Sequence, residues 1–88
     1  MRFQYRASKA TSNLKKHRVS FADAEGVFYD PLALHREDPD AEGEERLVAM
    51  GLGSAGQILV VVYTLRGDDI RNISARRATR REVREYEG

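Results

Sequence analysis

The chain has 88 residues, 41% of them hydrophobic and 33% charged, and its formal net charge is +1. This composition excludes an intrinsically disordered chain, and the length excludes a second hydrophobic core, so we expect one domain over residues 1–88. The absence of cysteine excludes disulfides, thiolate nucleophiles and cysteine-ligated zinc. Because residues 1–18 lack an apolar signal core and no apolar run is long enough to cross a bilayer, we expect a cytoplasmic protein.

The small net charge conceals a segregated charge distribution. Residues 1–18 contain six basic side chains and no acid, whereas residues 19–45 contain nine acids and Arg36 as the single base. Residues 76–88 hold five arginines, three glutamates and one tyrosine. The sequence pI near 8.1 is low for a nucleic-acid-binding domain, so that function requires folding to gather the two basic ends into one patch.

The first third of the chain predicts a strand and two helices. Polar and apolar residues alternate over 2–5, as in an edge strand. Ser8 is placed to cap a helix over 9–17, and Ser20 with Asp23 predicts the cap of a second helix that ends at Asp30-Pro31. The apolar face of the first helix is expected to carry Ala10, Leu14 and His17.

The rest of the chain predicts a meander of strands. A brief strand over 32–34 precedes an acidic loop over 37–45, and the strongest strand patterns cover 47–52 and 58–65. A further strand is expected over 70–76. Its alternation places Ile73 and Ala75 on one face, and Asn72, Ser74 and Arg76 on the other.

Thr79 and Glu82 have the spacing of a capping box and predict a final helix. The expected fold class is therefore α+β. It consists of an antiparallel sheet with two N-terminal helices packed on one face, a short C-terminal helix, and a polar sheet face that is left open.

Two motifs allow a functional and a structural interpretation. The glycines of 51–56 have the spacing of a dinucleotide-binding loop, but a strand follows where that loop needs a helix, so a hairpin turn is favoured. The acids of 37–45 could hold a divalent cation, but their spacing matches no known ligand pattern. A solvated loop is favoured there, and it could also hold a basic segment of a partner.

The basic ends of the chain carry the candidate chemistry. His17 could act as an acid, a base or a phosphate ligand, because histidine exchanges protons near neutral pH, or it could be a packed side chain. The C-terminal arginines could bind phosphate, or they could form an ordinary solvated helix on which Arg81 and Glu85 make an i, i+4 pair.

A set of short motifs spread over nearly the whole chain resembles the BrnT family of type II toxins. The motifs are Lys9, Asn13, Lys16-His17, Val19-Ser20-Phe21, Phe28-x-Asp30-Pro31, Glu45-Arg46, Ile73-Ser74-Ala75-Arg76 and Ala78-Thr79-x-x-Glu82. The resemblance implies a RelE-like fold and an RNA-cleaving activity that halts translation without a metal or cofactor. It also implies a ribbon-helix-helix antitoxin, BrnA, in a 2:2 complex that binds operator DNA through the antitoxin.

The resemblance also implies roles for individual residues. Arg76 and Arg80 are expected to bind the phosphate and Glu82 to act as the base, although a capping carboxylate is a poor proton acceptor. Further substrate-orienting or acid roles are expected for Lys16, His17 and Tyr86, and further RNA contacts for Arg46, Arg77 and Arg81.

The sequence departs from the family at Arg18, where BrnT proteins usually have glycine. Arginine resists the left-handed conformation that such a helix-ending turn uses. Two other interpretations of the chain remain open at this point: a non-catalytic nucleic-acid-binding module and a protein-interaction module.

Overall fold

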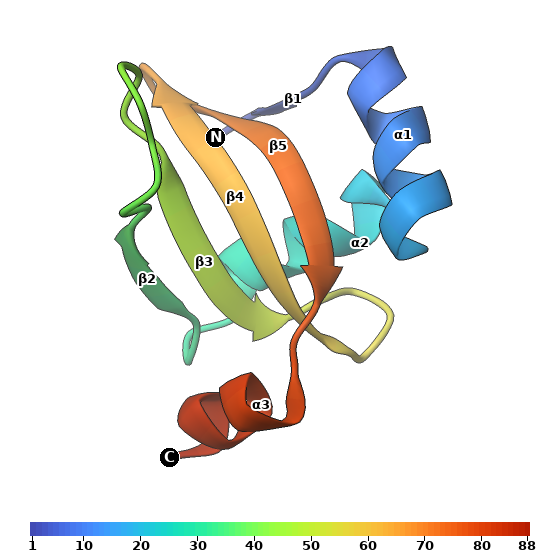
Figure 1. Ribbon diagram of the computed structural model, residues 1–88, viewed down its shortest axis with the longest axis vertical. Helices are drawn as coiled ribbons and strands as arrows, with labels where there is room; N and C mark the ends of the chain where they lie inside the picture. The colour runs from blue at the N-terminus through green and yellow to red at the C-terminus, as the bar shows by residue number, and fades with distance from the viewer.

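The computed structural model describes all 88 residues (Figure 1). The elements in chain order are β1 (Phe3–Gln4), α1 (Ala7–His17), α2 (Phe21–Glu25), the 3-10 turn η1 (Gly26–Tyr29), β2 (Leu34–Glu37), β3 (Leu47–Leu52), β4 (Ile58–Arg66), β5 (Asp69–Arg77) and α3 (Arg80–Glu87). The strands form one sheet in the order β1-β5-β4-β3-β2. None of the helices is long and apolar enough to cross a membrane.

The sheet is mixed, so the prediction of an antiparallel sheet is wrong at one edge. β2 to β5 are antiparallel to their neighbours, but β1 runs parallel to β5, with Phe3 opposite Ile70. Alternation of polar and apolar residues indicates a strand but carries no information on the direction of its partner. β1 pairs with the edge that β5 would otherwise leave open.

The two faces of the sheet are covered unequally. α1 and α2 lie on one face and enclose the main core of ten buried residues (Figure 1). α3 lies against one end of the opposite face, where Ala78 and Tyr86 pack on Val48, Met50 and Val60. We call this second face the open face, because only α3 covers part of it.

Helix α1 is anchored by a buried asparagine. The Asn13 amide donates to the carbonyl oxygens of Val19 (2.9 Å) and Ala75 (2.8 Å), and its own oxygen accepts from the Ala75 N–H (3.0 Å). These bonds turn Asn13 toward β5 and leave Leu14 50% exposed. The prediction that Leu14 faces the core is wrong, because periodicity counts apolar side chains and not hydrogen bonds to backbone.

The start of α1 differs from expectation, whereas its end at His17 is as predicted. The helix starts at Ala7, and Arg6 is its N-cap without a side-chain bond, so Ser8 lies inside the first turn and does not cap it. At the other end, Arg18 has φ 59° and ψ 29°, and its N–H donates to the Leu14 carbonyl at 2.9 Å. The helix therefore keeps a left-handed end although arginine occupies it.

The helix caps at Ser20 and Thr79 are as predicted. The Ser20 hydroxyl accepts from the Asp23 N–H at 3.0 Å, and Thr79 with Glu82 forms a capping box in which both reciprocal bonds are present. These signals are local, because the groups that bond are three residues apart.

Asp30 organises the segment that leads to β2. Its carboxylate accepts from the backbone N–H groups of Leu32 (2.9 Å) and Leu52 (2.8 Å). These bonds hold the segment in a turn, so β2 starts at Leu34 and the predicted strand over 32–34 is misplaced. The bond to β3 is long-range and leaves no pattern in the local sequence.

β5 contains a β-bulge that changes which side chains share a face. Asn72 and Ser74 pair with consecutive residues of β4, so Ile73 between them is an extra residue. Asn72 (1% exposed) and Ala75 (0%) are both buried as a result, whereas Ile73 is only partly buried. The prediction that Ile73 and Ala75 share a face is therefore wrong, since a bulge interrupts the two-residue alternation.

The glycine-rich segment forms the hairpin turn between β3 and β4, as predicted. The Gly53 N–H donates to the Gln57 carbonyl at 2.8 Å, and Gly56 has φ +88°. The turn also contacts α2, because the Ser54 N–H donates to the Asp23 carbonyl at 3.0 Å.

Candidate active site

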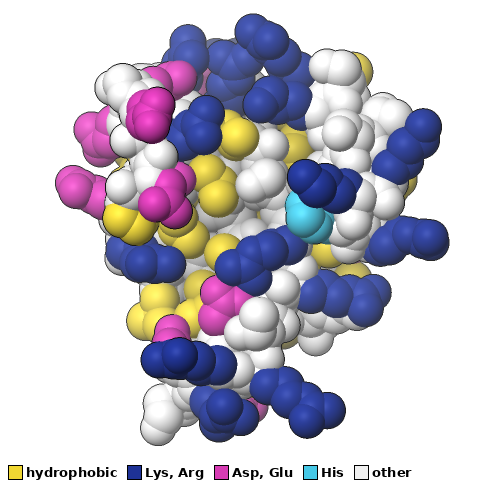
Figure 2. Space-filling model, viewed as in Figure 1, with side chains coloured by type: hydrophobic (Ala, Val, Ile, Leu, Met, Phe, Trp, Pro, Cys, Tyr) yellow, Lys and Arg dark blue, Asp and Glu magenta, His cyan; other side chains and the backbone are white.

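The open face carries an apolar strip with charged side chains around it. Figure 2 shows hydrophobic side chains in the middle of this face and lysine and arginine side chains around them. Val48, Met50 and Val60 form the strip. The face is therefore not uniformly polar, because β3 and β4 are apolar at successive positions and so present aliphatic side chains on both faces.

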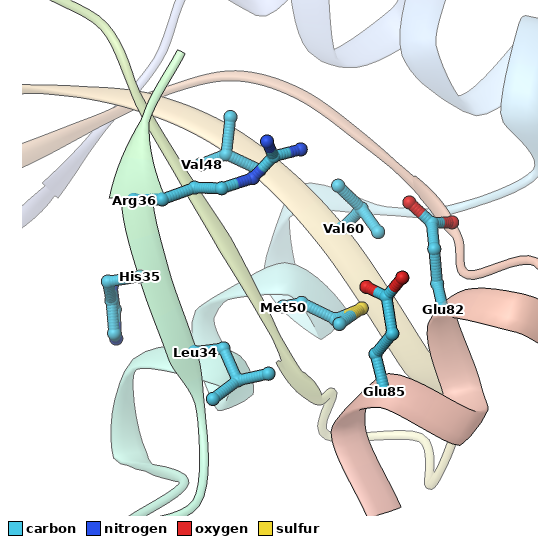
Figure 3. Close-up of a pocket in the computed structure, with 8 residues that line it drawn as sticks. All are labelled: Leu34, His35, Arg36, Val48, Met50, Val60, Glu82 and Glu85. Carbon is cyan, nitrogen blue, oxygen red and sulfur yellow. The ribbon is translucent and has the colours of Figure 1, made fainter. Parts of the chain in front are cut away.

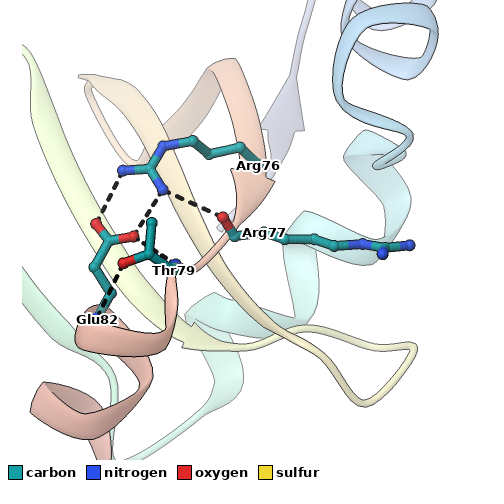
Figure 4. Close-up of polar contacts among 4 residues, drawn as sticks. All are labelled: Arg76, Arg77, Thr79 and Glu82. Atoms are coloured by element: carbon teal, nitrogen blue, oxygen red, sulfur yellow. Dashed lines mark hydrogen bonds and ion pairs between the residues drawn. The ribbon is translucent and has the colours of Figure 1, made fainter.

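Arg76, on β5, is held by Glu82, on α3. Two parallel hydrogen bonds of 2.7 and 2.9 Å join the guanidinium to the carboxylate (Figure 4). Glu82 also accepts from the Thr79 N–H at 2.8 Å, and Arg76 donates to the Arg77 carbonyl at 3.2 Å. Two N–H groups of Arg76, at Nε and Nη2, have no protein partner and remain available for an anion.

These contacts fix the charges of the pair. The hydrogen bonds from Arg76 lower the pKa of Glu82 from 4.5 to about 2. The hydrogen bonds to Glu82 in turn raise the pKa of Arg76. A carboxylate held this acidic is a poor proton acceptor, so the geometry favours Glu82 as the group that positions Arg76.

His17 and Arg76 line one groove of the open face, with a volume of about 270 Å³. His17 is the last residue of α1, and Ser74 and Arg76 lie on β5. Arg36 reaches the same groove from β2. We call this site the His17 groove. An imidazole and two guanidinium groups therefore come together from three separate elements.

A pocket of about 380 Å³ adjoins the His17 groove along α1. His17 and Ser74 line both hollows, and Lys9 and Lys16 line the adjoining pocket. Lys16 therefore lies beside any substrate that reaches His17 from this side.

Tyr86 does not line the His17 groove. Its hydroxyl donates to the Asp30 carboxylate at 2.5 Å. This bond raises the pKa of Tyr86 and lowers that of Asp30. The contact ties α3 to the turn before β2, which gives Tyr86 a structural role in the geometry seen.

The other arginines expected at the site lie outside the groove. The Arg77 side chain points away from Glu82 (Figure 4), and Arg80 is exposed without a side-chain hydrogen bond or ion pair. Arg81 lies 3.9 Å from Glu85 on α3, and Arg46 lines a different groove. One residue from each basic end, His17 and Arg76, lies in the His17 groove, so the two ends are not brought together as a whole.

The sequence interpretation missed Arg36. Leu34, Arg36 and the α3 carboxylates Glu82 and Glu85 line an adjoining hollow of about 130 Å³ (Figure 3). His35 points the other way, and its Nδ1 lies 2.9 Å from the Tyr63 hydroxyl. Arg36 is the only base among residues 19–45, and that isolation was the available signal.

The acidic loop borders the His17 groove through Asp38 and Asp40. Asp38 also accepts from the Asp40 N–H at 3.0 Å, and Glu44 pairs with Arg66 at 3.0 Å. No three His, Cys, Asp or Glu side chains are grouped so that they could hold a metal ion.

A mixed five-stranded sheet with two helices on one face and an arginine- and histidine-lined groove on the other defines a small α+β protein with a cationic groove. The family model described as "Ribonuclease toxin, BrnT, of type II toxin-antitoxin system" matches residues 5–82. The chain belongs to this BrnT family, which confirms the resemblance seen in the sequence. It is a ribonuclease toxin of a type II toxin-antitoxin system, and such a toxin has an antitoxin partner.

A solved structure supports the same fold. The crystal structure of the Brucella abortus ribonuclease toxin, BrnT, has a TM-score of 0.67 and 24% sequence identity to the chain. The match covers 91% of this chain and 99% of that one. No curated protein matches the chain.

Proposed function

We propose that the chain is a RelE-like, metal-independent endoribonuclease that cleaves RNA in the cytoplasm and so inhibits translation. The observation that supports this proposal is the His17 groove, in which His17 lies with Arg76 and Arg36. Metal-free RNA cleavage needs a proton acceptor for the ribose 2′-hydroxyl, cations on the phosphate and a proton donor for the leaving oxygen. Side chains in and beside the groove can fill each role.

Arg76 and Arg36 are assigned to the phosphate. The free Nε and Nη2 groups of Arg76 can donate to two phosphate oxygens, and Glu82 holds the guanidinium in place before substrate arrives. Preorganised donors of this kind are each worth about 3 kcal/mol of barrier. Glu82 is thus a positioning residue, and the exposed Arg77, Arg80 and Arg81 are assigned contacts to RNA backbone beyond the groove.

His17 is assigned to proton transfer. It takes the proton of the 2′-hydroxyl while the 2′-oxygen bonds to phosphorus and the bond from phosphorus to the 5′-oxygen breaks. Lys16, in the adjoining pocket, supplies the proton that the leaving 5′-oxygen needs. The products are a 2′,3′-cyclic phosphate and a 5′-hydroxyl, so RNA is cut, whereas DNA of the same sequence is bound and left intact.

The proposed antitoxin is a BrnA-like ribbon-helix-helix protein. Family membership supports this partner, and the expected assembly is a 2:2 complex that binds operator DNA through the antitoxin. The apolar strip of the open face gives the antitoxin a surface to cover beside the site that it must block.

The proposal is tested by incubating the purified protein with RNA in EDTA. We expect RNA products with cyclic phosphate ends, and we expect the purified antitoxin to inhibit their formation. Intact RNA after incubation with demonstrably folded protein would rule out a metal-free nuclease, and salt-sensitive binding without products would support a non-catalytic module instead.

His17→Gln tests the proton transfer, with His35→Gln as its matched control. We expect the His17 variant to lose at least about a hundredfold in kcat and to lose the acidic limb of the pH profile. The control should keep wild-type kinetics, because His35 does not line the His17 groove and its Nδ1 lies 2.9 Å from the Tyr63 hydroxyl. Equal rates for both variants would remove His17 from the mechanism.

The role of Glu82 is tested with Glu82→Gln, which keeps an acceptor for the Thr79 N–H. A positioning residue should reduce kcat by about tenfold through looser placement of Arg76, and leave the shape of the pH profile unchanged. Loss of the acidic limb in this variant would instead identify Glu82 as the base.

A further inference from the structure

A second cationic groove lies at the end of the sheet opposite α3, near the β4–β5 turn. It has a volume of about 210 Å³. Lysine and arginine side chains gather over this end of the sheet (Figures 1 and 2). We call it the distal groove, and its basic side chains are Arg6, Lys9, Arg46, Arg66 and Arg71.

The positive charge of the distal groove is largely uncompensated. Glu44 is the only acid that lines it, and it pairs with Arg66 at 3.0 Å where both side chains are about half exposed. Cations that converge without counter-charges repel one another and raise the local concentration of anions. The four that form no ion pair are Arg6, Lys9, Arg46 and Arg71.

Two buried polar side chains in this groove lack protein partners. Thr64 is 2% exposed and Asn72 is 1% exposed, and both line the groove. Neither the Thr64 hydroxyl nor either polar atom of the Asn72 side chain makes a hydrogen bond. An unpaired buried polar group destabilises the fold. Thr64 lies on the same sheet face as Arg71, with which it pairs, whereas Asn72, the next residue along β5, lies on the covered face. The unpaired Thr64 hydroxyl beside uncompensated cations therefore indicates a site organised for a ligand.

The distal groove is connected to the His17 groove along β5. Lys9 and Ile73 line both the distal groove and the adjoining pocket, and His17 and Ser74 line both that pocket and the His17 groove. Arg71 pairs with Thr64 and Arg76 with Val60, so both arginines lie on the same sheet face. Their partners are four positions apart on β4, which places the two arginines about 14 Å apart along the sheet.

We propose that the distal groove is a phosphate-binding subsite for single-stranded RNA, several nucleotides from the scissile bond. This inference rests on the proposed function, since it extends the substrate of the His17 groove. The guanidinium groups of Arg46 and Arg71 bind one backbone phosphate, and the Thr64 hydroxyl supplies a hydrogen bond to one of its oxygens. Longer RNAs are therefore bound more tightly and cut at the same rate per bound molecule.

Arg46→Gln/Arg71→Gln tests this subsite, with Lys15→Gln as the control for a lost surface charge. Lys15 is exposed on α1 and lines neither groove. With an RNA of about eight nucleotides, the double variant should raise KM by about tenfold for each lost arginine, with kcat unchanged. The salt slope of log K should fall by about 0.7 per arginine, and a dinucleotide substrate should show no change.

The buried hydroxyl is tested with Thr64→Val, and Asn72→Leu, on the covered face, is the control. Removing an unpaired buried polar group leaves the free energy of unfolding unchanged or raises it. The affinity of the Thr64 variant for the oligonucleotide should nevertheless fall several-fold, and that of the Asn72 variant should stay unchanged. Stability gained in the Thr64 variant without loss of RNA affinity would show that this side chain does not contact RNA and would overturn that part of the subsite.

Binding of an uncleavable oligonucleotide, with 2′-deoxyribose at every position, separates this proposal from the proposed function. Weakened binding of this probe by the double variant supports the subsite even if no RNA is cut. Cleavage by wild type with equal KM in the double variant overturns the subsite alone. Inorganic phosphate that binds the distal groove as tightly as the oligonucleotide, or a double variant that loses only antitoxin binding, would also overturn it.

Discussion

At the scale of single residues, Arg18 holds a conformation that its side chain opposes. It is the only residue other than glycine with positive φ, at 59°. The Cβ of an L-residue in this region approaches the following carbonyl oxygen and costs about 1–2 kcal/mol. The helix end is retained because the Arg18 N–H completes the last bond of α1, to the Leu14 carbonyl at 2.9 Å.

Arg18→Gly should therefore stabilise the protein. We expect the free energy of unfolding to rise by about 1 kcal/mol, reduced a little by the greater freedom of glycine in the unfolded chain. Urea denaturation measures the difference, and Arg18→Ala should give no such gain because it keeps the Cβ. A glycine variant no more stable than the alanine variant would show that Arg18 is unstrained.

Asn13 makes three buried hydrogen bonds to backbone, so its loss should destabilise the fold strongly. Asn13→Ala leaves the Val19 carbonyl and both backbone groups of Ala75 without their partner. We expect a loss of about 3 kcal/mol or more in urea denaturation, because each unsatisfied buried group costs about 1–3 kcal/mol. The exposed neighbour Ser12→Ala is the control, and a similar small effect for both would contradict the role given to Asn13.

At the scale of elements, α3 is held to the sheet mainly by polar contacts at its two ends. The Arg76–Glu82 pair and the capping box fix its start, and the Tyr86–Asp30 bond fixes its last turn. Its side chains include none that is fully buried. The ion pair that positions the proposed phosphate-binding arginine is therefore also the attachment of the helix.

This attachment should make stability depend on pH through Glu82. The pKa of Glu82 is lowered from 4.5 to about 2 in the folded state, so its contribution is complete above about pH 4.5 and is lost as the pH falls through about 2. Arg76 is 43% exposed, so solvent screening reduces that contribution to about 1 kcal/mol. The difference in unfolding free energy between wild type and Glu82→Gln, measured by urea denaturation, should shrink over this window, and a difference that stays constant would contradict this role.

The elements that the sequence predicted well are those specified by nearby residues. The cap of α3 depends on Thr79 and Glu82 alone, and the strand over 47–52 is apolar along its whole length. The start of β2 and the side of α1 that faces the core were predicted wrongly. They depend on Asp30 and Asn13, which bond to segments far along the chain. The same limit applies to the site: His17 and Arg76 were recognised by residue type, but only the sheet brings Arg36 beside them.

At the scale of the whole molecule, the buried core and the basic grooves lie on different sides of the sheet. The buried core lies on the face covered by α1 and α2, whereas the basic grooves lie along β5 and the open face. The chain therefore carries opposite charges on neighbouring surfaces, with the acidic loop beside the His17 groove. A net charge of +1 therefore understates the positive field along β5.

The covered face depends on a close approach between the β3–β4 turn and the end of α2. A Cβ on Gly26 would lie 2.5 Å from the Ser54 backbone nitrogen, and a Cβ on Gly53 would lie 2.6 Å from a methyl group of Leu59 and 3.0 Å from the Asp23 carbonyl oxygen. Neither glycine has positive φ, so backbone conformation does not require them. Both are required because a Cβ would not fit in the space available. The hairpin and the helix can shift apart only by breaking the Ser54 N–H bond to Asp23.

Gly26→Ala should consequently destabilise the molecule by about 2–4 kcal/mol, because the clash is with backbone that cannot rotate away. Thermal unfolding measures the change, and about 1 kcal/mol lowers Tm by roughly 4–8 °C in a domain of this size. Ala55→Ser, exposed in the same turn, is the control. If Gly26→Ala unfolds at the wild-type temperature, the β3–β4 hairpin does not approach the end of α2 in solution as closely as the structure shows.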